Sequence, residues 1–142
     1  MATVSTDGLE ELFADLGSLA EIPDDVIADM LIAEAEVVAE AQAQEARTML
    51  SGEFAQGITA GSITFDKKLK IKGSEKSISV YPKGTRRDGN RRSVSEVAFI
   101  NEFGKAGQPA RPFINTANEK SADDAVDAAA RVYDEFLKSK NL

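Results

Sequence analysis

NEFGKAGQPARPFINTA, residues 101–117, breaks a run of helix-forming sequence with two glycines and two prolines. Each proline holds φ at about −65° and disfavours helical geometry in the residue before it, so residues 108–113 are expected to form an extended connector. Gly104 suits the conformation that ends a helix. The stretch therefore predicts a rigid corner between two helices, with Phe103 and Phe113 buried on either side of it.

The charged residues of this corner predict a structural contact. Glu102 falls in the last turn of the preceding helix, where the helix dipole disfavours a carboxylate by up to about 1 kcal/mol. Arg111, across the turn and between Ala110 and Pro112, is the cation that could reverse this penalty. We therefore expect a Glu102–Arg111 clasp. Catalysis would need a nucleophile or a second carboxylate nearby, and the segment has neither, so no catalytic residue is expected and the protein is not expected to be an enzyme.

Helices are predicted on both sides of the corner. Ser93 and Glu96 have the spacing of a capping box, followed by about ten helical residues that end at Gly104. A final helix is predicted over residues 116–138. The side chains expected on its buried face are Ala122, Val126, Ala129, Val132, Tyr133, Phe136 and Leu137.

A long helix is predicted upstream, over residues 23–50, because Pro23 suits the first turn and no glycine or proline follows until Gly52. Its apolar stripe consists of Val26, Ile27, Met30, Val37, Val38, Ala41 and Met49. At a rise of 1.5 Å per residue it measures about 40 Å, longer than a small domain is wide. Either part of it packs on something outside its own domain, or it is one helix that packs wholly at home.

Residues 58–65, 69–72 and 77–81 alternate with a period of two, which predicts short antiparallel strands. Lys67, Lys68, Lys70 and Lys72 are expected on a solvated face that protects a sheet edge. The expected fold class is α+β, with a short antiparallel sheet packed against the long helix and the C-terminal helix, and a short helix before the proline-rich connector. Residues 23–142 would form this single domain. Residues 1–22 would be an acidic helical extension, with Leu9, Leu12, Phe13, Leu16 and Leu19 at helical spacing.

Composition excludes several classes of site. The chain has no cysteine and no histidine, so disulfides, thiol nucleophiles, histidine bases and the common transition-metal ligands are excluded. We expect no cofactor and no metal. No apolar run approaches the roughly 18 residues of a membrane span, and the N-terminus lacks the pattern of a signal peptide, so a soluble intracellular protein without membrane contact is expected.

Charge is unevenly distributed along the chain. Residues 1–50 carry twelve acids and one base, whereas residues 51–115 carry six acids and twelve bases. This asymmetry suggests that unlike surfaces meet, within the fold or between copies. Residues 82–92 form a predicted loop with five bases and one acid. Either it is simply solvated, or it contacts an acidic surface such as the N-terminal arm of a neighbour, or passing DNA. Its basic residues are Lys83, Arg86, Arg87, Arg91 and Arg92.

Two motifs carry a resemblance to a known family. Asn-Glu102-Phe103-Gly104, a short turn, and then Pro109-Ala110-Arg111-Pro112-Phe113 before an alanine-rich helix resemble the small tail-component proteins of long-tailed bacteriophages. These are the tail-completion or head–tail joining proteins of the neck. The stretch Ser51, Gly52, Phe54 and Ile58 is similar to the helix-ending Thr-Gly-x-Leu-x-x-Ser-Ile of that family, with Ser51 for Thr, Phe54 for Leu and Gly57 for Ser. The similarity covers residues 46–120.

The resemblance implies a structural virion protein of a phage or prophage, assembled in the host bacterial cytoplasm and located in the tail or neck. Its partners would be further copies of itself, arranged as an oligomeric ring, and other neck or tail-tube proteins. A tail terminator or head-closure protein would share this role. A DNA-binding regulator would need a basic recognition helix, and a carboxylate-only hydrolase would need two converging acids, so both fit the sequence less well.

Overall fold

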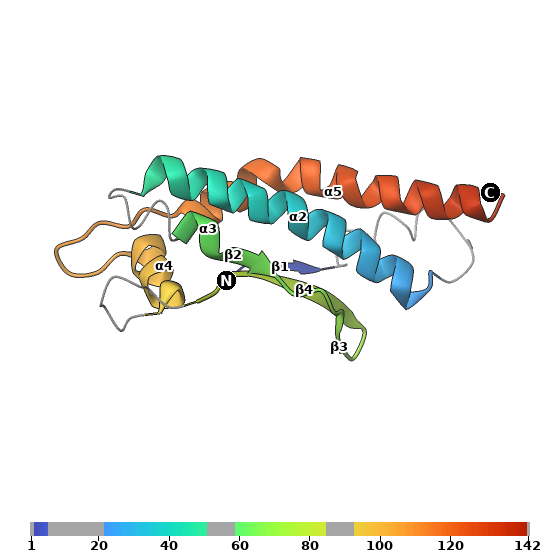
Figure 1. Cartoon of the computed structure of the whole chain (residues 1–142), viewed down its shortest axis with the longest axis horizontal. Helices are drawn as coiled ribbons and strands as arrows, with labels where there is room; N and C mark the ends of the chain where they lie inside the picture. Colours follow the sequence, from blue (N-terminus) through green and yellow to red (C-terminus); the bar gives the residue numbers. More distant parts are fainter. Residues whose placement is uncertain (1, 6–21, 51–58, 85–92, 142) are drawn as a thin grey trace.

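The computed structural model describes residues 2–5, 22–50, 59–84 and 93–141, and confirms the α+β fold. In Figure 1 two long helices run side by side in opposite directions above a sheet, and α2 lies against the sheet. The short α4 occupies the end of the molecule where α2 finishes. The elements are β1 (Ala2–Ser5), α2 (Asp24–Met49), α3 (Ala60–Ser62), β2 (Ile63–Phe65), β3 (Lys70–Lys72), β4 (Glu75–Pro82), α4 (Val94–Phe103) and α5 (Phe113–Ser139).

Strand β4 is the centre of the antiparallel sheet. β1 pairs with one side of it, in a register that sets Ala2 opposite Val80, while β2 and β3 pair with different parts of the other side. β3 and β4, which correspond to the strands predicted over residues 69–72 and 77–81, form a hairpin whose turn contains Gly73 at a φ of 63°. The four lysines at and before the hairpin are exposed, as expected.

Strand β1 is not predicted by the sequence. Its pairing with β4 joins residues 2–5 to the sheet, although they fall within the expected helical extension of residues 1–22. The amphipathic helix predicted after it lies outside the described residues. The boundary between that extension and the domain of residues 23–142 stays a prediction.

The first predicted strand is wrong over part of its length. The described part of this segment is residues 59–65, of which only residues 63–65 form a strand, and residues 60–62 form a short helical turn instead. The hydroxyl of Ser62 donates a hydrogen bond of 2.7 Å to the carbonyl of Thr59. Such local bonding of a serine to its own backbone competes with the ladder of a sheet, and a period of two in the sequence does not reveal it.

Helix α2 is confirmed, and it packs within its own chain along its whole length. Near its start Met30 packs with Tyr133, in the middle Val38 belongs to the cluster that contains Ile78, and at its end Ala46 packs with Phe113. The interpretation that part of this helix packs outside its own domain is therefore not needed to bury its apolar face. The antiparallel α5 supplies one partner surface and the sheet supplies the other.

The buried face of α5 agrees with the predicted one in the second half of the helix, where Ala129 and Tyr133 are buried and Val132, Phe136 and Leu137 are partly buried beside them, and differs from it in the first half. The helix begins at Phe113, three residues earlier than expected, and buries every fourth side chain: Phe113, Ala117, Ser121, Ala125, Ala129 and Tyr133. Val126 is 42% exposed, and Ala122 is exposed as well. In the first half the buried positions after Phe113 are Ala117, Ser121 and Ala125, whose small side chains let two helix backbones approach closely. Packing against α2 therefore selects the alanines.

Glu34 is a buried acid on α2. Its side chain is 5% exposed, and no ion pair or hydrogen bond to it occurs among the described residues. Burial disfavours the charged form and raises the pKa of Glu34 to about 7 from 4.5. The helix layer therefore contains a carboxyl group that is partly protonated at neutral pH.

Candidate functional site

The corner between α4 and α5 begins with two predicted features of α4. The hydroxyl of Ser93 accepts a hydrogen bond of 3.1 Å from the N–H of Glu96, as a capping residue does. The helix ends at Gly104, which has a φ of 77°. A Cβ atom at this position would lie 2.9 Å from the backbone nitrogen of Ala110 and 2.9 Å from the carbonyl oxygen of Gln108. Only glycine fits here without displacing the connector.

The connector folds back along α4. Lys105 and Gln108 exchange backbone hydrogen bonds of 3.0 and 2.9 Å around a tight turn that contains Gly107 at a φ of 79°. The N–H of Arg111 then donates to the carbonyl of Asn101 at 2.6 Å. These backbone bonds fix the position from which α5 starts.

Glu102 binds the first turn of α5 directly. Its carboxylate oxygens accept hydrogen bonds of 2.8 and 2.9 Å from the N–H groups of Ile114 and Asn115. Pro112 precedes the helix and provides no capping side chain, so Glu102 supplies the acceptor from another helix. A carboxylate at a helix N-terminus is also stabilised by the helix dipole. This capping role is not predicted by the sequence, and the pair between Glu102 and Arg111 stays a prediction.

The two phenylalanines that flank the corner lie in opposite environments. Phe113 is fully buried, as predicted, and packs near Ala98 and the end of α2. Phe103 is 66% exposed, so its predicted burial is wrong. The reason is the helical period: α4 buries Val94, Ala98, Asn101 and Glu102, and Phe103 lies beside this buried face rather than on it.

An apolar groove of about 690 Å³ opens beside this corner. It lies between α4, the first turns of α5 and Pro82 at the end of β4. Phe99 and Phe103 form part of its lining, with ring centroids 4.7 Å apart, and they are 63% and 66% exposed. Glu102 also lines the groove, but its carboxylate already accepts hydrogen bonds from two backbone N–H groups. The groove therefore suits apolar contact better than proton transfer.

Other predicted site residues fall in different places. Ser51, Gly52, Phe54 and Ile58, and the four arginines of the predicted basic loop (Arg86, Arg87, Arg91 and Arg92), lie outside the described residues. Lys83 is exposed at the start of that loop, and its N–H donates to the carbonyl of Ser62 at 2.9 Å. Pro109 and Ala110 are exposed on the connector.

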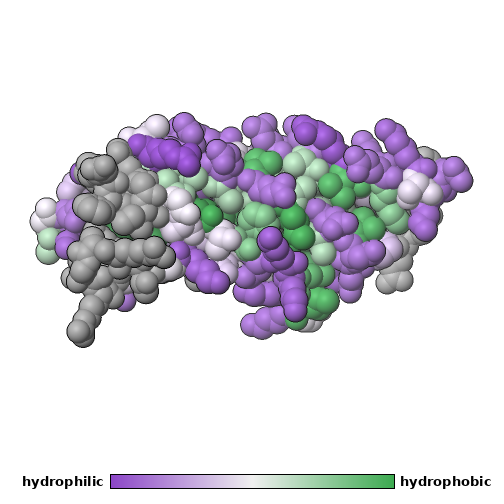
Figure 2. Space-filling model, in the orientation of Figure 1, coloured by the Kyte–Doolittle hydropathy of each residue, from purple (hydrophilic) through white to green (hydrophobic). Residues whose placement is uncertain are grey.

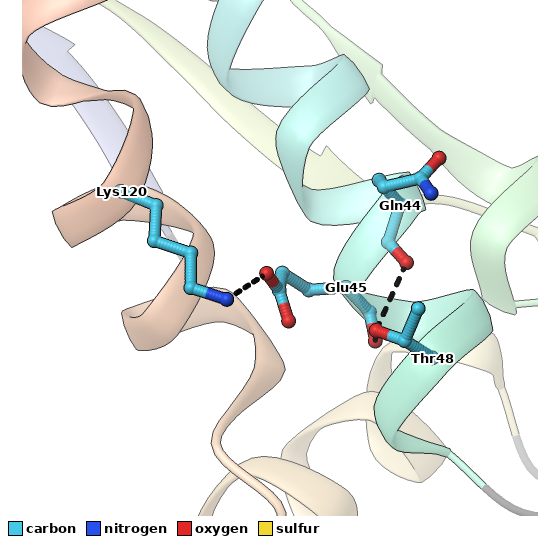
Figure 3. Close-up of polar contacts among 4 residues, drawn as sticks. All are labelled: Gln44, Glu45, Thr48 and Lys120. Carbon is cyan, nitrogen blue, oxygen red and sulfur yellow. Dashed lines mark hydrogen bonds and ion pairs between the residues drawn. The ribbon is translucent and has the colours of Figure 1, made fainter.

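Polar contacts align α5 with α2 next to the corner. The ammonium of Lys120 lies 2.7 Å from the carboxylate of Glu45, as Figure 3 shows. In the buried interface close by, Gln42 donates a hydrogen bond of 3.0 Å to the side chain of Asn118. In Figure 2 hydrophilic side chains crowd the edge formed by the two helices, and hydrophobic residues are visible between these helices and the sheet. The helix pair thus presents a hydrophilic outer edge.

The remaining titratable contacts are structural. Asp66 forms an ion pair of 3.0 Å with Lys70 and accepts a hydrogen bond from Tyr81. The hydrogen bond from Lys70 is the main reason that the pKa of Asp66 is lowered, and the hydrogen bond to Asp66 raises the pKa of Tyr81. Within the part of the chain that the structure describes, no three acidic side chains gather as metal ligands would. None of the helices described has the length and apolar character of a membrane span.

Comparison with protein families, with curated proteins and with solved structures finds no match to this chain.

Proposed function

We propose that this chain is a structural virion protein of a tailed phage or prophage, which acts in tail completion or head–tail joining as a ring of identical copies. It would assemble in the bacterial cytoplasm and stay in the tail or neck, in contact with other neck or tail-tube proteins. The proposal rests first on the resemblance of residues 101–113 to the tail-component family. It needs no catalytic group, cofactor or metal.

The observation that carries the proposal is that the motif residues lie together at the corner between α4 and α5. Glu102 caps α5, Gly104 allows the close approach of Ala110, and Phe113 is buried at the start of α5. The motif thus builds a corner rather than a reaction centre. A structural role explains why these residues occur together at this spacing. A catalytic role would have to use Glu102 while it is bound to backbone groups, and no second acid lines the groove among the described residues.

The distribution of charge supports assembly of identical copies. The helix layer exposes acids on α2 and α5, among them Glu36, Glu40, Asp123, Asp124 and Asp127. The hairpin region at the other side of the sheet exposes lysines. A ring is held by heterologous contacts, in which one face meets a different face of the next copy, and unlike charges on separate faces favour such contacts.

Electron microscopy of negatively stained protein tests the proposal. The purified chain should form rings, alone or when mixed with tail tubes of the phage or prophage that encodes it, and the rings should bind the tube ends. A chain that stays monomeric and leaves the tube ends bare would contradict the proposed function.

A further inference from the structure

The groove between α4 and α5 carries an apolar surface that the described residues of a single copy leave open. Phe99 and Phe103 are the two most exposed large hydrophobic side chains among the described residues, and they stand together on one side of α4. Paired aromatic rings at a concave surface are typical of an interface, because they bury a large area at a small cost in side-chain entropy. Ile114 and Pro82 continue the apolar lining inside the groove.

The chain itself contains a segment of matching chemistry. Residues 6–21 carry five acids and no base, and the sequence predicts an amphipathic helix with Leu9, Leu12, Phe13, Leu16 and Leu19 on one face. Apolar residues at positions i, i+3, i+4 and i+7 are the pattern by which a helix binds in an apolar groove. The five acids would lie on the other faces of such a helix.

We propose that the α4–α5 groove binds the acidic segment of residues 6–21 from a neighbouring copy of this chain. Charge complementarity favours this occupant. Pro82 and Ser95 line the groove, and the chain between them holds five basic residues and one acid. Lys83, one of these five, is exposed, and so is Lys105, two residues after Phe103. An acidic helix is therefore attracted to this end of the molecule, and its apolar face covers the two phenylalanines.

The segment of the same copy does not reach the groove as a helix. Ile22, the residue that follows it, packs near Met30 and Tyr133 at the far end of the helix pair. The groove adjoins Phe113 and Ala98, which pack on Ala46 near the other end of α2. Asp24 is the first residue of α2, and Ala43 belongs to the same cluster as Ala46. At a rise of 1.5 Å per residue these two residues are about 29 Å apart along the helix. Three residues of extended chain span at most about 11 Å, so Leu19 stays near Ile22.

The contact is therefore head-to-tail. Each copy has its groove at one end of the molecule, where α4 lies in Figure 1. The segment that would bind in the groove of the next copy is attached at the other end, where α2 starts. Contacts of this kind are heterologous and repeat around a closed ring. The inference rests on the proposed function, for which it supplies the contact between copies.

Two variants and a control test the contact in the full-length protein by sedimentation velocity across a range of concentrations. The groove variant is Phe99→Ser with Phe103→Ser, and the segment variant is Leu12→Ser with Phe13→Ser. Each is expected to weaken self-association by more than about tenfold, because each removes two buried aromatic or aliphatic anchors. Ile71→Ser, which changes another exposed apolar residue, is expected to assemble like the unmodified chain.

Mixing the two variants gives the decisive result. One intact groove and one intact segment remain in the mixture, so we expect a one-to-one complex and no larger species. Added salt should weaken this complex. A segment variant that assembles normally, or a mixture that stays monomeric, overturns the inference. If the groove variant fails to fold by circular dichroism, Phe103→Ser alone replaces it.

The same samples separate this inference from the proposed function. An unmodified chain that is monomeric yet binds the ends of tail tubes overturns the contact and leaves the function standing. Rings that persist in both variants do the same. Chains that assemble through the groove but never bind a tube end support the contact and count against the function.

Discussion

Replacing Glu34 with glutamine should remove a pH dependence of stability that this buried carboxyl creates. The pKa of Glu34 is about 7 in the folded chain, against 4.5 for an ordinary glutamate. Between these two values the folded state binds a proton that the unfolded state has lost. Stability therefore falls as pH rises through this window, which is the opposite of the usual behaviour of a paired carboxylate.

The size of the effect follows from the shift of the pKa. A shift of about 2.5 pH units corresponds to roughly 3 kcal/mol of stability at 1.36 kcal/mol per unit. This contribution is present below the unfolded pKa and is lost above the folded one. Between about pH 5 and about pH 8 the unmodified chain should lose roughly 2–3 kcal/mol relative to Glu34→Gln, whose amide does not titrate.

Urea denaturation of both chains at several pH values, followed by circular dichroism, measures this difference. Glu36→Gln is the matched control, because Glu36 lies on the same helix but is exposed. The control should follow the unmodified chain within about 0.5 kcal/mol at every pH. Parallel stability curves for the unmodified chain and Glu34→Gln would refute the reasoning, since they would mean that Glu34 titrates alike in the folded and unfolded states.

Three further predictions concern the corner, and denaturation midpoints check all of them. Phe113→Ala should cost about 3–5 kcal/mol because the side chain is fully buried, whereas Phe103→Ala should cost less than about 0.5 kcal/mol, and equal losses would contradict the assignment. Glu102→Ala should cost about 1–3 kcal/mol by leaving two N–H groups of α5 without their acceptor; strictly additive losses with Arg111→Ala would show that the predicted clasp does not exist. Gly104→Ala should cost at least about 1 kcal/mol, since the new methyl group meets backbone atoms, and an unchanged midpoint would argue against the close approach.

In the proposed assembly the corner would keep the groove between α4 and α5 in a fixed shape. Backbone bonds, the cap from Glu102 and the buried Phe113 hold α4 at a set position against α5. The groove between them would otherwise change its shape with any movement of α4. A rigid corner keeps the groove ready for a partner, and this preorganisation lowers the entropic cost of binding.

Local features of the sequence were enough to predict the main helices and turns. The span of α2 follows from the absence of glycine and proline, the start and end of α4 follow from Ser93 and Gly104, and the hairpin follows from the alternation around Gly73. Each of these signals acts within about four residues of chain, so neighbouring residues alone decide it.

Only the tertiary structure decided which partners these elements meet. It paired β1 with β4, chose the alanines of α5 as the buried face, exposed Phe103 and brought Glu102 to the first turn of another helix. Each outcome depends on residues far apart in the chain, because close packing and the capping of a helix by a remote side chain are set in space. Spacing along the sequence does not contain that geometry. The prediction therefore placed Val126 on the buried face from its hydrophobicity alone, and paired Arg111 with Glu102 from its charge alone.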